Sequence, residues 1–167
     1  MAKIRTIKVG RVQSATSLQS NEYSMEINNH ADTRCLGSNF LPIHYFGRLV
    51  DVSGWDVSAG SFEGPTISGA IAYDHLISGQ VYMLVYHKSI HCPRLTSHLM
   101  LIMQSRMEGV RINELPKFLA EDPDEKTHEI IAYYPLNPNE PLVIPLVLKG
   151  VAIYLPSRKP RASEYED

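Results

Sequence analysis

Short stretches rich in β-branched and aromatic residues recur along the chain, and residues that favour turns separate them. Glycine, proline, asparagine, aspartate and serine stand at the breaks, where the backbone has to reverse direction. A succession of this kind predicts an all-β domain. The strands are expected at residues 24–27, 49–52, 66–73, 81–86, 129–134, 142–148 and 151–155.

Two hairpin turns can be placed in this pattern. Residues 81–86 form a continuous run without a charged residue, as expected for a strand that is covered on both faces. Residues 77–79, Ile-Ser-Gly, supply a turn just before it. Lys149 and Gly150 are expected to turn a final hairpin between the last two strands.

One segment has the spacing of a helix instead. It spans residues 95–107, with Thr96 or Ser97 available as the N-cap and Gly109 placed to end it. We expect one substantial helix here, with its methionines packed in the core. The apolar positions that define the stripe are Leu95, Leu99, Ile102, Met103 and Met107.

The 167 residues suffice for one core plus an extension. Proline becomes frequent after residue 113, so a boundary is predicted near Asn113. The expected divisions are an N-terminal leader or strand at 1–21, a main domain at 22–113, a β-rich extension at 114–156 and a flexible polar tail at 157–167.

Charge and cysteine content restrict the partners and the compartment. A formal net charge of -2 gives no reason to propose nucleic acid or an anionic membrane as a partner, and no apolar run could span a bilayer. A peptide or protein partner fits better. Cys35 and Cys92 are too few for a disulfide framework, which favours a reducing, cytoplasmic location. The first 21 residues are basic and free of acidic residues, so a transit peptide is the alternative to an N-terminal strand.

Residues 25–33 carry the most informative motif. They read Met-Glu-Ile-Asn-Asn-His-Ala-Asp-Thr, an apolar strand end that enters a tight polar turn. The motif resembles the active-site turn of retropepsin-like aspartic proteases, in which an apolar residue precedes Asp, Ser or Thr, Gly, Ala, and then Asp or Ser. Some copia-type retrotransposons have Asp-Ser-His-Ala-Asp-Thr here, so His30 fits that subgroup. Asn28 stands where the family has its catalytic aspartate.

A second match follows downstream in the expected order. Residues 86–100 are similar to a run of copia-type elements that leads into a short helix, and in retropepsins this region is a strand beside the active-site turn. The resemblance covers residues 22–118 and extends more weakly over 145–160. It implies a mostly β fold: a retropepsin-like closed β-barrel half with one short C-terminal helix, plus a C-terminal β-hairpin extension.

The resemblance also implies a function. Retropepsins are homodimers in which two aspartates, one from each subunit, share a proton and activate water. The amide of Asn28 cannot accept that proton, so the expected function is an aspartic endopeptidase domain for polyprotein processing that is inactive as written. Natural decay of the element and an engineered knockout would both leave Asn28. The alternative function is a non-catalytic dimeric module for peptide binding or assembly.

The remaining site residues also follow from the resemblance. Asn29, His30, Ala31 and Asp32 complete the turn, and Asp32 either bonds the backbone of an extended peptide or caps the turn locally. Residues 50–56 occupy the place of the flap, the hairpin that closes over bound peptide. Gly54 would allow the turn at its tip. Trp55 either covers the substrate or packs in the core.

A metal-binding site is the alternative to an aspartic-protease site. The chain has seven histidines, and His87, His91 and Cys92 lie close in sequence. A pair four residues apart meets on a helix, whereas these residues fall in a predicted strand, and no Cys-x-x-Cys pair is present. His30 as the base of another hydrolase would need a third orienting group that we do not identify. We therefore expect no metal and no cofactor.

Overall fold

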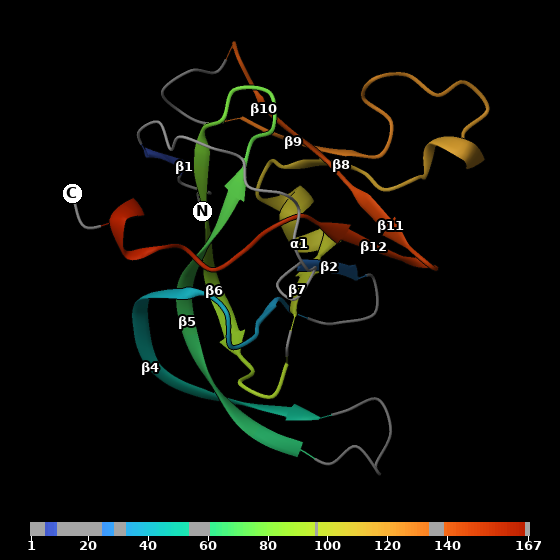
Figure 1. Ribbon diagram of the computed structural model, residues 1–167. Coiled ribbons are helices and arrows are strands. Elements are labelled where there is room, and N and C mark those ends of the chain that lie inside the picture. Colours follow the sequence, from blue (N-terminus) through green and yellow to red (C-terminus); the bar gives the residue numbers. More distant parts are fainter. Residues whose placement is uncertain are drawn as a thin grey trace.

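A computed structural model of the chain describes residues 6–9, 25–28, 33–53, 61–95, 97–133 and 139–165. These residues are mostly β-structure with one short α-helix, α1 (Ile102–Met107), which confirms the predicted mostly β class. They form a large and a small sheet (Figure 1). The large sheet contains β1 (Thr6–Val9), β2 (Met25–Asn28), β3 (Cys35–Leu36), β4 (Leu41–Ser53), β5 (Ser61–Asp74), β6 (Val81–His91), β7 (His98–Leu101), β11 (Val147–Lys149) and β12 (Ala152–Leu155).

Parallel pairing marks the middle of the large sheet. β2 lies parallel to β7, and β3 lies parallel to the end of β6 while it also contacts β7 in the antiparallel sense. β12 pairs with the other edge of β2 and continues the sheet to β11. Because parallel neighbours cannot be joined by a tight hairpin, these pairs bring together segments that lie far apart in the sequence.

The strands β4 and β5 form the longest hairpin. They curve away from the rest of the molecule (Figure 1), and their last described pair is Ser53 with Ser61. β4 pairs only with β5 within the described residues and forms one edge of the sheet, and β11 forms the other. The large sheet is therefore open in the described part of the chain, and the expected closed barrel does not appear there.

The small sheet covers the main core. It contains β8 (Arg111–Asn113), β9 (Glu129–Ala132) and β10 (Leu142–Pro145), in the order β10, β9, β8. Its buried side chains share one apolar cluster with residues of the large sheet. Folding therefore removes the facing surfaces of the two sheets from water together. The cluster includes Met25, Leu36, Met100, Ile112, Ile130, Ile144 and Leu155.

The predicted helix at 95–107 is wrong in its first half. Residues 98–101 form β7, whose side chains alternate between buried and half-buried positions as a strand requires. Pairing with β2 and β3 on both sides outweighs the helical spacing of the apolar residues. Met103 and Met107 are exposed on the short helix and do not pack in the core, whereas Gly109 does follow its end with a φ of 88°.

The other sequence predictions need smaller corrections. The single strand expected at 142–148 is two strands in different sheets, because Leu146 turns inward and its N–H donates to the carbonyl oxygen of His128 at 3.0 Å. The turns at Gly79 and Gly150 are confirmed, both with positive φ. Near the N-terminus, Thr6–Val9 form the strand β1, which pairs with β6. None of the described helices is long and apolar enough to cross a membrane.

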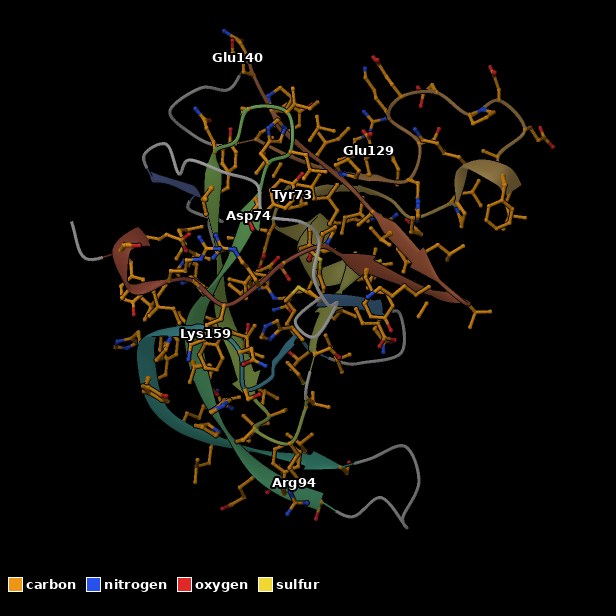
Figure 2. The ribbon with its side chains drawn as sticks, in the orientation of Figure 1. Tyr73, Asp74, Arg94, Glu129, Glu140 and Lys159 are labelled. Atoms are coloured by element: carbon orange, nitrogen blue, oxygen red, sulfur yellow. The ribbon has the colours of Figure 1, made fainter. Side chains whose placement is uncertain are left out.

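The segment that the sequence predicts as a flexible tail makes specific contacts with β5. Arg158 exchanges two backbone hydrogen bonds with Ala72, and its guanidinium group donates to both oxygens of Asp74 at 2.7 Å. The same guanidinium group donates to the buried Glu164 at 2.6 and 2.9 Å. Asp74 lies at the end of β5 beside this segment (Figure 2). The short 3-10 helices η2 (Lys117–Leu119) and η3 (Ala162–Glu164) complete the described fold.

Removing the Glu164 carboxylate should release this segment. We expect Glu164→Ala to raise the rate of tryptic cleavage after Arg158 and Arg161 about tenfold, because bonds to charged groups contribute about 1.5 to 3 kcal/mol each. The exposed Ser163→Ala is the control and should leave the rate unchanged. Equal rates for the two variants would show that the contacts do not hold the segment in solution.

Candidate functional site

Asn28 lies where β2 leaves the sheet. It is the last residue of the strand, it is half-buried, and its Cα is paired with that of Leu101 across the parallel strands β2 and β7. The next residue after Leu101 begins α1. The end of one buried strand and the start of the helix therefore lie side by side, and the polar side chain of Asn28 stands at that junction.

The other predicted site residues fall outside the described part of the chain. These are Asn29, His30, Ala31 and Asp32 in the turn, and Gly54 and Trp55 at the expected flap. What the structure does describe is the approach to each position. The residues predicted as the turn come directly after β2 in the sequence, and residues 54–60 come between β4 and β5. Val50 and Val52, close to the last described pair of that hairpin, pack against a cluster around Cys35.

A buried ion pair holds the chain at Arg34, shortly after the residues that the sequence predicts as the turn. The guanidinium group of Arg34 is bonded to both carboxylate oxygens of Glu108, with 2.6 Å from Nη1 to Oε2. It also donates to the carbonyl oxygen of His87 at 3.1 Å and lies over the ring of Tyr86. Arg34 is fully buried. Arg34 is thereby tied to the end of α1 and to β6.

The backbone of Arg34 adds to this support. Its N–H donates to Oε1 of Gln104 in α1 at 3.3 Å, and its carbonyl oxygen accepts from Ile90 at 3.0 Å. The sequence analysis did not identify Arg34 or Glu108, because 74 positions separate the two partners. The only sequence signal is a charged residue immediately before the apolar pair of β3, where an unpaired charge would be costly.

His98 at the start of β7 holds the next turn. Its Nδ1 accepts from the backbone N–H of Gly37 at 3.0 Å, so Nε2 carries the proton and donates to the carbonyl oxygen of Asn39 at 3.1 Å. Burial lowers the pKa of His98 to about 4, since a charged ring would lose its hydration. Gly37 fits here because a Cβ would lie 2.5 Å from the carbonyl oxygen of Leu95.

The buried His98 should make the protein sensitive to acid. The unfolded chain binds a proton at this histidine near pH 6.5 and the folded chain only near pH 4, so stability falls as the pH drops through that interval. The loss attributable to His98 is about 3 kcal/mol. Urea unfolding of the wild type and of His98→Gln between pH 7 and pH 4 checks this. At pH 7 the variant should be less stable than the wild type, but its free energy of unfolding should fall less between pH 7 and pH 4. Equal losses in the two proteins would contradict the assignment to His98.

The residues of the rival metal hypothesis have other partners. His87 Nδ1 lies 3.0 Å from the hydroxyl of Ser68, and His91 packs edge-on against Phe40. Cys92 is buried beside Cys35. The residues that the structure describes contain no group of three potential metal ligands.

A shallow cleft of about 330 Å³ lies elsewhere on the molecule. Its walls come from the η2 region, β9, β10 and β11, and none of its lining residues belongs to β2, β7 or the long hairpin. Glu129 is buried in it, and burial raises the pKa of its carboxyl group. The cleft is therefore separate from the junction at Asn28.

Comparison with known proteins gives no independent identification. No family model, no curated protein and no solved structure matches the chain.

Proposed function

We propose that the chain is a retropepsin-like domain of a copia-type retrotransposon polyprotein, which binds extended peptide segments and lacks peptidase activity because Asn28 replaces the catalytic aspartate. The arrangement of β2, β7 and α1 carries this proposal. The strand that ends in the candidate turn runs parallel to a strand that passes directly into the helix. This is the order that the resemblance implies for the two motifs at residues 25–33 and 86–100.

The long hairpin supports a role in peptide binding. Its strands carry the chain out to residues 54–60, where the flap is expected, and return it to β6. An extended peptide would lie between this hairpin and the turn after Asn28 and would bond through its backbone as an added strand. Asp32 and Trp55 are the proposed contacts.

Catalysis would require a second copy of the chain, because one chain supplies only one such turn. β12 already pairs with the edge of β2 that lies opposite β7, so a second copy cannot add its strand at that edge. The proposed homodimer therefore meets at the ends of the β2 strands, where the two Asn28 side chains would face each other. Sedimentation over a range of concentrations tests this, and a strictly monomeric mass at the highest one would count against it.

A peptidase assay of the chain beside Asn28→Asp tests the proposed chemistry. A non-catalytic assembly module is the second candidate, supported by the absence of a carboxylate at position 28. If both proteins bind peptide and neither cleaves it, the assembly module is favoured. Cleavage by the aspartate variant alone would favour the inactivated protease.

A further inference from the structure

The two cysteines of the chain meet beneath the long hairpin. Cys35 in β3 is opposite Ile90 of β6, and the N–H of Cys92, one residue beyond β6, donates to the carbonyl oxygen of Leu36 at 2.8 Å. Side chains alternate across a sheet, so Cys35, Ile90 and Cys92 face the same side. All three are buried in one cluster, in which the two cysteine side chains pack together.

We propose that Cys35 and Cys92 form a reversible disulfide, which makes this pair a modification site for thiol–disulfide exchange with small disulfides such as oxidised glutathione. The chain has no other cysteine, so the pair has no competing partner within the molecule. Both thiols are free in the structure described above. The inference does not depend on the proposed function, since it concerns only the packing of β3 against β6.

The two sulfurs are not equivalent. The thiol of Cys92 donates to the sulfur of Cys35, which lowers the pKa of Cys35 and raises that of Cys92. Cys35 is also the less deeply buried of the two, with 8% of its surface exposed against 3%. Since the thiolate is the attacking form, Cys35 is assigned as the first nucleophile and Cys92 as the resolving thiol.

The exchange balances in two steps. The Cys35 thiolate attacks one sulfur of oxidised glutathione, forms a mixed disulfide and releases one glutathione thiolate. Cys92 then loses its proton to solvent and attacks the Cys35 sulfur, which forms the Cys35–Cys92 bond and releases the second glutathione thiolate. The two cysteines are oxidised by two electrons in total, and one glutathione disulfide is reduced to two thiols.

The location of the pair links its redox state to the hairpin. Val50, Val52 and Phe62 of β4 and β5 pack against the cysteine cluster. The oxidant would therefore reach Cys35 when this end of the hairpin, at the Val52–Phe62 pair, moves away from the cluster. Phe62→Ala should accelerate the first step without changing the final product.

Titration with defined ratios of reduced to oxidised glutathione tests the proposal. After free thiols are capped with N-ethylmaleimide, the intact mass should show an uncapped species that has lost two hydrogens, and dithiothreitol should reverse it. The midpoint in native buffer should lie at a value of [GSH]²/[GSSG] about tenfold or more above the midpoint in urea, because the fold holds the thiols together. Equal midpoints in the two solvents would overturn the proposal, as would a chain that keeps two capped thiols at every ratio.

Two single variants test the order of the steps. Cys92→Ser should accumulate glutathione on Cys35, because the resolving thiol is missing, whereas Cys35→Ser should react several-fold more slowly. Equal rates would overturn the assignment of Cys35 as the nucleophile. Disulfide-linked dimers of the wild type on a non-reducing gel, in place of the internal bond, would overturn the pairing itself.

Discussion

Asn28→Asp is expected to raise the rate of peptide cleavage by about a thousandfold over the chain as given, whose activity should not exceed background. The amide of Asn28 can donate and accept hydrogen bonds but cannot take a proton from water near neutral pH. An aspartate has nearly the same shape and supplies a carboxylate that can act as the general base. In a symmetric dimer it also restores the neutral partner that donates to the scissile carbonyl group.

The pH range of this assay needs a matching measurement of folding. The activity should be greatest at acidic to near-neutral pH, where one of two facing carboxyl groups is protonated. The buried His98 lowers the stability of the fold over the same interval. Activity at each pH between 4 and 7 is therefore divided by the folded fraction, measured by circular dichroism on the same sample.

Asn28→Ser is the matched control, since its side chain is small and polar but supplies no carboxylate. It should remain as inactive as the wild type. If Asn28→Asp folds and dimerises normally yet cleaves neither a peptide library nor its own flanking sequences, the loss of function extends beyond position 28. The non-catalytic module would then be the better account.

Local pattern was sufficient for most of the fold. Strands bounded by glycine turns could be predicted because their signals are local. The turn at Gly79 and the apolar run of β6 that follows it lie within a few residues of each other. The segment at 98–101 could not, since its helical spacing is overruled by pairing with β2, some seventy positions away. The same is true of the unexpected length of β4, which is set by its partner β5.

The candidate site divides in the same way. Asn28 could be identified from a continuous motif, and the structure describes it at a strand end. The buried residues that hold the chain after this motif could not be identified, because Arg34, His98 and Glu108 have partners distant in sequence. Their roles depend on burial, which a single sequence does not reveal for a charged or titratable residue.

The ion pair between Arg34 and Glu108 should be the most sensitive of these supports. Glu108→Gln removes the charge that compensates a fully buried guanidinium group and should cost about 3 to 5 kcal/mol of unfolding free energy. A loss of that size is a large part of the stability of an ordinary domain. Urea unfolding at neutral pH measures it.

Glu114→Gln, at the residue that follows β8, provides the matched control. Glu114 accepts a bond of 2.6 Å from Arg106, but both side chains are partly exposed, so the loss should be at most about 1 kcal/mol. The double variant Arg34→Met, Glu108→Met should recover much of the loss, since it removes both buried charges and fills the space with apolar atoms. A Glu108→Gln variant no less stable than Glu114→Gln would mean that water reaches Arg34 and that this pair does not hold the chain at Arg34.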